Sequence, residues 1–214
     1  MIPILYQDHS ILVCQKPVGI LSQPSPDCAE SMLSLLSGQC GGQVFPVHRL
    51  DRGVGGVMVF ARTSGGAAAL SRAVQQGSLV KEYLCIVQGC PEEAEGTYQD
   101  LLFKDSSRNK TFVVRRMRKG VKEASLSYHV LSSQEGRSLV QVRLHTGRTH
   151  QIRVQFSSRG MPLIGDRRYG GPAAEAIALW SWRLCFPHPD TGEAMVFCCV
   201  PEGGLWQPFQ NDLP

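Results

Sequence analysis

The chain has 214 residues, which is long enough to bury a core without disulfide or metal staples and excludes the mini-protein class. Hydrophobic residues make up 43% and charged residues 19%, which excludes disordered and fibrous proteins, and the net charge of +4 is only mildly basic. The N-terminus has no basic leader, and no apolar run approaches the ~18 to 20 residues of a membrane span, so we expect a cytoplasmic protein.

Most of the expected elements are short strands. Apolar residues either alternate with polar ones or form short continuous runs, and turn residues follow them. The alternation is clearest around Leu126 and Val142, where every second side chain is apolar. We expect strands over residues 2–6, 10–14, 56–62, 80–88, 124–130, 140–144, 179–186 and 194–200.

Two helices are expected among these strands. Thr63 or Ser64 can cap the first, which extends to about residue 76. The second is expected to begin with Thr149 as its cap, and Ile152 and Phe156 then point inward. Many strands and few helices predict an α+β fold with a mixed, mainly antiparallel β-sheet and peripheral helices. Because no repeat or long linker interrupts the chain, we expect a single domain over residues 1–214.

The basic residues are concentrated in two windows. Residues 104–122 hold eight of them beside one acid, Asp105, and residues 143–168 hold six arginines beside Asp166. Clustered positive charge is typical of a surface that binds the phosphates of a nucleic acid. A solvated basic face without such a partner is the alternative interpretation.

The eight cysteines do not form the compact, regular spacing of a disulfide framework, so we expect reduced thiols. Cys85 and Cys90 together with Cys198 and Cys199 are conceivable zinc ligands, but the chain has no Cys-x2-Cys pair. We therefore expect no structural metal, and a zinc or redox protein remains an alternative.

The segment directly before the strand at 56–62 holds the first candidate for chemistry. It is a turn in which Asp51 stands between Arg49 and Arg52, followed by three glycines that let a ligand approach the backbone closely. Nearby cations favour the ionised carboxylate, and an ionised carboxylate can act as a nucleophile. Alternatively, Asp51 caps a turn or pairs with a neighbouring arginine.

The second candidate segment spans residues 145–153, at the end of one strand and the start of the second helix. Backbone amides at a helix start, with Arg148 beside them, suit an oxyanion or a phosphate. The segment lacks the lysine and second glycine of a nucleotide-triphosphate loop. His48, His145 and His150 lie in these two segments, but their spacing matches no metal-ligand set.

Taken with three further segments, the turn around Asp51 resembles the signature of the RluA-type family of RNA pseudouridine synthases. The likeness runs in order from residue 4 to about residue 200, and the opening residues 4–19 are similar as well. The matching segments are His48-Arg49-Leu50-Asp51, Lys81-Glu82-Tyr83, Thr146-Gly147-Arg148-Thr149-His150-Gln151-Ile152-Arg153 and Pro162-Leu163-Ile164-Gly165-Asp166.

The resemblance implies the pseudouridine synthase catalytic fold, with an active-site cleft on one face. It implies an enzyme that isomerises uridine to pseudouridine in structured RNA, either rRNA or tRNA, without cofactor or metal. By motif match, Asp51 is the catalytic carboxylate, Tyr83 stacks on the target base, and Arg153 pairs with Asp51. His48 and Arg49 contact the substrate, and Arg49 helps to extrude the nucleotide.

Three positions depart from the pattern of the family. Val54-Gly55-Gly56 stands where Thr-Ser-Gly is usual, Val154-Gln155 where Val-His is usual, and Leu179-Trp180-Ser181 where Leu-His-Ala is usual. Because the hydroxyls beside Asp51 are missing, a catalytically silent RNA-binding protein or RNA chaperone on the same fold is the alternative function.

The resemblance begins at the catalytic domain, so we expect no separate N-terminal RNA-binding module. Recognition of the RNA is then expected from the two basic windows, with Arg115, Arg116, Arg118 and Arg148 as substrate contacts. We also expect a monomer.

Overall fold

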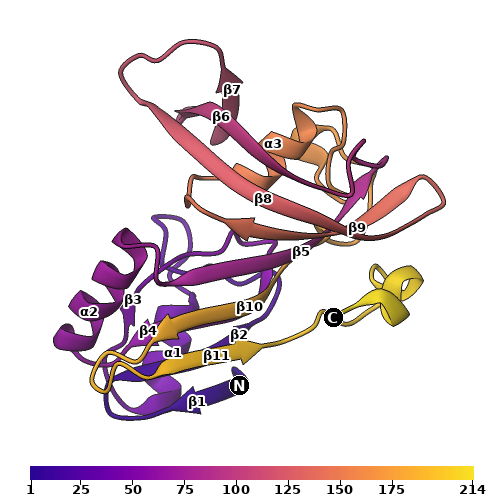
Figure 1. The fold of residues 1–214 in the computed structure, drawn as a ribbon. Helices are drawn as coiled ribbons and strands as arrows, with labels where there is room; N and C mark the ends of the chain where they lie inside the picture. Colours follow the sequence, from indigo (N-terminus) through magenta and orange to yellow (C-terminus); the bar gives the residue numbers. More distant parts are fainter. The chain divides into compact units, whose positions relative to one another are not determined.

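The computed structural model describes all 214 residues, and the chain folds into two compact units (Figure 1). Unit 1 comprises Met1–Lys81 and Trp180–Pro201, and unit 2 comprises Glu82–Leu179 and Glu202–Pro214. Each unit contains residues from distant parts of the chain, so neither is a continuous segment. That the two act as one catalytic domain stays a prediction.

Unit 1 is built on a mixed sheet in which strands follow the order β1-β2-β4-β10. β2 pairs antiparallel with β1 and β4, and β4 pairs parallel with β10. Every residue of β4 is buried, as its continuous apolar run predicts. β3 and β11 extend this sheet by antiparallel pairs with β4 and β10. The bounds are β1 Ile4–Gln7, β2 Ile11–Lys16, β3 Phe45–Pro46, β4 Gly55–Ala61, β10 Leu179–Pro187 and β11 Ala194–Cys198.

The helices of unit 1 are α1 (Met32–Cys40) and α2 (Ser64–Gln75). Of the two predicted caps, Thr63 and Ser64, it is Thr63 that caps α2, since its hydroxyl accepts a hydrogen bond from the backbone amide of Gly66 at 3.0 Å. Leu70 of α2 is fully buried and belongs to the core cluster of the sheet. α1 was not predicted, because its short sequence has a weak apolar periodicity.

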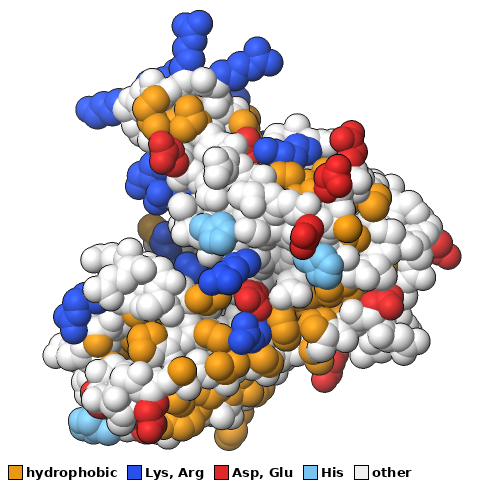
Figure 2. All heavy atoms as spheres, in the orientation of Figure 1, with side chains coloured by type: hydrophobic (Ala, Val, Ile, Leu, Met, Phe, Trp, Pro, Cys, Tyr) orange, Lys and Arg blue, Asp and Glu red, His pale blue; other side chains and the backbone are white.

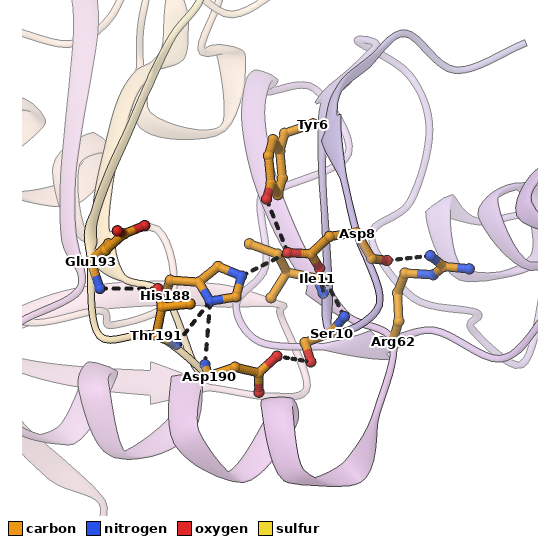
Figure 3. Close-up of polar contacts among 9 residues, drawn as sticks. All are labelled: Tyr6, Asp8, Ser10, Ile11, Arg62, His188, Asp190, Thr191 and Glu193. Carbon is orange, nitrogen blue, oxygen red and sulfur yellow. Dashed lines mark hydrogen bonds and ion pairs between the residues drawn. The ribbon is translucent and has the colours of Figure 1, made fainter.

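A cluster of polar side chains joins the turn between β1 and β2 to the turn between β10 and β11 (Figure 3). The carboxylate of Asp8 accepts hydrogen bonds from the hydroxyl of Tyr6 at 3.0 Å and from Nε2 of His188 at 2.7 Å. The backbone amides of Ser10 and Ile11 also donate to it, each at 2.8 Å. Burial raises the pKa of Asp8, but these hydrogen bonds outweigh burial and hold the pKa below its usual value.

Asp8→Asn is expected to lower the free energy of unfolding by about 1 kcal/mol at neutral pH, because it removes the charged acceptor. A carboxylate with a lowered pKa stabilises the fold fully above its unfolded pKa, and this stability is lost as the pH falls through the folded pKa. The difference between the variant and the wild type should therefore shrink from about pH 5 to about pH 2. Thermal denaturation across this range checks it, and a difference that does not change with pH would contradict it.

The sheet of unit 2 has the strand order β5-β9-β8-β6-β7. β8 pairs antiparallel with both β9 and β6, and β6 with β7. Ala124, Leu126 and Tyr128 of β8 are buried as their alternation predicts, whereas a register shift follows Val130. β6 and β7 were not predicted, because their apolar residues, such as Leu101, Leu102 and Phe103, stand in short runs and do not alternate regularly. The bounds are β5 Val80–Gln88, β6 Glu95–Asp105, β7 Lys110–Val114, β8 Val121–Gln134 and β9 Arg137–Leu144.

The short helices of unit 2 are α3 (Gln151–Ser157) and the 3-10 turns η1 (Arg167–Tyr169) and η2 (Gln207–Asp212). Ile152 and Phe156 of α3 are buried as predicted. The prediction that Thr149 caps this helix is wrong. The cap position is occupied by His150, which has left-handed backbone angles and makes no capping bond with its side chain. The carbonyl of Thr149 instead accepts a hydrogen bond from the hydroxyl of Thr111 at 2.9 Å.

These observations confirm the predicted fold class, a mixed and mainly antiparallel β fold with few helices. None of the helices has both the length and the apolar composition required to cross a membrane.

Candidate active site

The turn that carries Asp51 lies in unit 1 and is held by backbone contacts on both sides. Before Asp51, the amide of Leu50 donates to the hydroxyl of Ser22 at 3.0 Å, and the same hydroxyl donates to the carbonyl of Leu50 at 2.8 Å. After it, the amide of Val54 donates to the carbonyl of Asp51 at 3.0 Å and closes the turn. Asp51 itself is half-buried. The turn therefore presents a partly accessible carboxylate on a fixed backbone.

A fully buried lysine at the end of β2 supports this turn. The ammonium group of Lys16 donates to the backbone carbonyls of Pro17, Arg52 and Val54 at 2.9, 3.3 and 2.7 Å. These bonds match the three donors of an ammonium group. Burial lowers the pKa of Lys16 to about 8, while the charge of Asp51 acts in the opposite direction. At neutral pH the structure thus keeps a buried positive charge beside the Asp51 turn.

Lys16→Met is expected to reduce the rate of the reaction about tenfold, because the carbonyls of the Asp51 turn lose a shared donor. Methionine keeps most of the length of the side chain, so the core remains filled. Single-turnover kinetics at saturating substrate check the rate, and the thermal midpoint shows whether the protein is folded. A folded variant with wild-type rate would show that the lysine is not needed to hold the turn.

Two departures from the family pattern are coupled in the structure. A Cβ atom built on Gly55 would lie 2.3 Å from Cζ3 of Trp180, and one built on Gly56 would lie 2.1 Å from the carbonyl oxygen of Ser181. The indole of Trp180 therefore fills the space that a serine at position 55 would need. Its Nε1 donates to the carbonyl of Cys199 at 2.7 Å. The missing hydroxyl on β4 thus accompanies a larger side chain on β10.

His48 turns toward the backbone of β4, where its Nε2 accepts a hydrogen bond from the amide of Val59 at 3.3 Å. Its Nδ1 is buried and makes no hydrogen bond. Burial, and then the charge of Lys81, lower the pKa of His48 to about 3, so the imidazole is neutral at pH 7. Arg49 is exposed. The predicted substrate contacts of His48 and Arg49 stay predictions.

The other two predicted catalytic residues belong to unit 2. Tyr83 on β5 and Arg153 on α3 are both only 5% exposed. Nε and Nη2 of Arg153 donate to the two carboxylate oxygens of Asp166 at 2.7 and 2.8 Å. The sequence interpretation missed this partner, although Asp166 stands in one of the matching segments. The pairing of Arg153 with Asp51 stays a prediction.

The segment between β9 and α3 is fixed by Gln151. The side-chain oxygen of Gln151 accepts hydrogen bonds from the hydroxyl of Thr146 at 2.8 Å and from the amide of Arg148 at 3.0 Å. The amide of Gln151 donates to the carbonyl of Arg148, so the helix-start amide proposed for an anion is already engaged. Nε of Arg148 donates to the carbonyl of Glu123 at 2.8 Å. A phosphate contact by Arg148 stays a prediction.

Both basic windows lie in unit 2, where they adjoin each other. The amide of Thr111 donates to the phenolic oxygen of Tyr169 at 2.8 Å, and the guanidinium of Arg168 donates to the carbonyl of Asn109. The loop between β7 and β8 (residues 115–120) is fully exposed, and Figure 2 shows several Lys and Arg side chains projecting from this end of unit 2. Among its arginines, Arg118 lies over the ring of Phe103 at 4.9 Å. The three arginines of this loop are Arg115, Arg116 and Arg118.

All eight cysteines carry free thiols, and Cys14 and Cys85 are buried. No three side chains of histidine, cysteine, aspartate or glutamate come together in an arrangement that could hold a metal ion. The cysteine pairs considered from the sequence therefore do not assemble into a ligand set.

Comparison with known proteins identifies the class to which this chain belongs, the RNA pseudouridine synthases. The sequence pattern of the RNA pseudouridylate synthase family matches residues 10–158. The chain is 34% identical to the dual-specificity RNA pseudouridine synthase RluA of Yersinia pestis, over 93% of this chain and 98% of that protein. It is 37% identical to an RNA pseudouridine synthase of Aquifex aeolicus, over 92% of this chain and 68% of that protein.

Among solved structures, human RNA Pseudouridylate Synthase Domain Containing 4 has the same fold. It matches with a TM-score of 0.77 at 24% identity, and the match covers 92% of this chain and 88% of the human one. The chain belongs to the RluA-type family of RNA pseudouridine synthases. It is thus an isomerase that converts uridine to pseudouridine in RNA.

Proposed function

We propose that Asp51 is the nucleophile of this isomerisation, and that the target is a uridine in a structured rRNA or tRNA. The observation that carries the proposal is the turn itself: Ser22 and Lys16 fix the backbone on both sides of Asp51 and leave its carboxylate half-buried. A fixed, partly desolvated carboxylate suits attack on a nucleoside, because little reorganisation is needed at the moment of reaction.

The isomerisation breaks the bond between N1 of uracil and C1′ of ribose and forms a bond between C5 and C1′. The proton of C5 is lost and N1 gains one, so no atom is added or removed and no oxidant or reductant is needed. In our proposal Asp51 forms the transient bond to the nucleoside. The ring of Tyr83 stacks on the uracil and Arg153 pairs with Asp51, while Arg49 fills the space that the extruded nucleotide leaves.

The deciding experiment maps pseudouridines chemically in rRNA and tRNA from cells with and without the gene. Loss of one or more pseudouridines identifies the target RNA, and purified protein should restore them on an unmodified transcript. An unchanged map, together with retained RNA binding, would favour the silent RNA-binding alternative. We also propose that the protein is a monomer, and that it acts in the cytoplasm, where a reducing environment suits its free thiols.

Recognition of the RNA is proposed to rest on the two adjoining basic windows of unit 2. Replacing Arg115, Arg116 and Arg118 together by glutamine should weaken RNA binding and reduce the slope of log affinity against log salt by up to about 3, or about 1 per lost phosphate contact. Titrations at several salt concentrations measure this slope.

The matched control replaces exposed arginines outside both windows, Arg72 and Arg137. This control should leave the slope almost unaltered. If the two variants changed the slope alike, the loop between β7 and β8 would not be the RNA-binding surface.

A further inference from the structure

Arg153 is held by a buried carboxylate, Asp166, that the reaction scheme does not use. Asp166 is 1% exposed and Arg153 is 5% exposed, and their contact is bidentate, at 2.7 and 2.8 Å. A guanidinium group has five N–H donors in a fixed plane. Because Asp166 binds the edge formed by Nε and Nη2, it fixes both the position and the plane of the guanidinium.

An aromatic ring supports the same guanidinium. Cζ of Arg153 lies 5.1 Å from the centroid of the ring of Tyr169, within the range of a cation–π contact. The ring is itself fixed, since its phenolic oxygen accepts a hydrogen bond from the amide of Thr111 at 2.8 Å and lies 2.9 Å from Nδ1 of His150. The guanidinium therefore meets a carboxylate and an aromatic ring that are both held in place.

The loop around Asp166 is built closely around this carboxylate. The amide of Asp166 donates to the carbonyl of Leu163 at 3.1 Å, and its carbonyl accepts from the amide of Gly171 at 2.9 Å. A Cβ on Gly171 would lie 2.0 Å from the carbonyl oxygen of Leu163, and a Cβ on Gly165 would lie 1.8 Å from that of Ala176. Only glycine fits at these two positions, because a Cβ atom would overlap the carbonyl oxygens. The tightly packed loop therefore determines the position of the Asp166 side chain.

We propose that Asp166 is a positioning residue of the reaction. Its carboxylate, with the ring of Tyr169, holds the guanidinium of Arg153 in the orientation in which Arg153 acts on Asp51. This inference rests on the proposed function, because it assumes that Arg153 serves Asp51. Its alternative is a purely structural pair, in which Asp166 only neutralises a buried charge.

The test compares Asp166→Glu and Asp166→Asn. Glutamate keeps the charge but moves the guanidinium by about one bond length, and a misplacement of about 1 Å is expected to cost up to 100-fold in rate. We expect Asp166→Glu to remain folded and to lose at least about tenfold in single-turnover rate at saturating RNA. Asp166→Asn should lose as much or more, while RNA affinity stays within about twofold in both. A folded Asp166→Glu variant with wild-type rate would overturn the proposal.

A double variant provides a readout that a structural role would not move. If Asp166 acts through Arg153, the rate of Arg153→Lys combined with Asp166→Asn should equal that of Arg153→Lys alone. Rate losses that multiply would overturn the proposal. Should Asp166→Asn fail to fold, the Asp166→Glu result decides alone.

The matched control is Asp8→Asn. Asp8 is a partly buried carboxylate of unit 1 outside both basic windows, and it accepts hydrogen bonds from Nε2 of His188 at 2.7 Å and from the hydroxyl of Tyr6 at 3.0 Å. Its variant should lose thermal stability but keep the wild-type rate, and a loss of rate equal to that of Asp166→Asn would overturn the proposal. Asp51→Ala is measured in the same assay. If Asp51→Ala is active, the proposed function fails; if it is inactive while the Asp166 variants are active, only this inference fails.

Discussion

Asp51→Asn is expected to reduce the formation of pseudouridine by at least about 10⁴-fold, because the amide cannot act as a nucleophile. The side chains of Ser22 and Lys16 hold the turn through hydrogen bonds with the backbone of neighbouring residues. Because these bonds do not involve the side chain of Asp51, the turn should persist in the variant. RNA affinity should stay within a few fold, since the substitution removes the chemistry and leaves the basic windows unchanged. Single-turnover assays on an RNA identified by the pseudouridine map measure the rate.

As a control, two measurements show whether the variant is folded and still binds RNA. Its thermal midpoint and its RNA affinity should both resemble those of the wild type. Asp51→Ala gives a second measurement, because alanine removes the side chain without offering an amide as a substitute. Full activity of the folded alanine variant on its native RNA would refute the assignment of Asp51 as the nucleophile.

Arg153→Lys is expected to reduce the rate about 100-fold, although the charge is kept. Lysine has a compact ammonium group and cannot form the planar, bidentate contact that the guanidinium makes with Asp166. The ammonium group therefore cannot both form the two hydrogen bonds to Asp166 and act on Asp51 with the geometry of the guanidinium. The loss should appear in the rate at saturating RNA and not in RNA affinity.

Arg62→Lys is the matched control for this substitution. Arg62 is a partly buried arginine of unit 1 outside both basic windows, and its guanidinium donates to the carbonyl of Asp8. The control should keep the wild-type rate. Near wild-type turnover in Arg153→Lys would show that the planar fork is not required.

The departures beside Asp51 bear on the choice between an enzyme and a silent RNA-binding protein. The missing side chain at Gly55 is matched by the indole of Trp180, whose Cζ3 lies only 2.3 Å from the position of a Cβ at residue 55. A site that had only lost its hydroxyl would leave the space unfilled. The coupled change thus indicates a repacked wall beside the turn, and the pseudouridine map decides between the two functions.

Local patterns predicted most strands and the candidate residues. The buried strand β4, the cap Thr63 and the alternation around Leu126 depend on neighbours close in sequence, so periodicity and capping chemistry suffice to find them. Likewise, the segment around Asp51 was recognised because its motif is continuous. Strands β6 and β7 were missed, since their apolar residues do not alternate regularly and pairing with other strands defines them.

The sequence by itself thus determined the fold class, the family and the residues on which the chemistry is proposed to depend. Only the tertiary structure decided how these residues are supported: that Lys16 is buried under the Asp51 turn, that Asp166 binds Arg153, and that Trp180 fills the space beside Gly55. Each of these contacts joins segments well separated along the chain, where local propensity carries no information. In the sequence, Lys16 and Asp166 resemble charged residues that are exposed to solvent, and only the folded structure shows that both are buried.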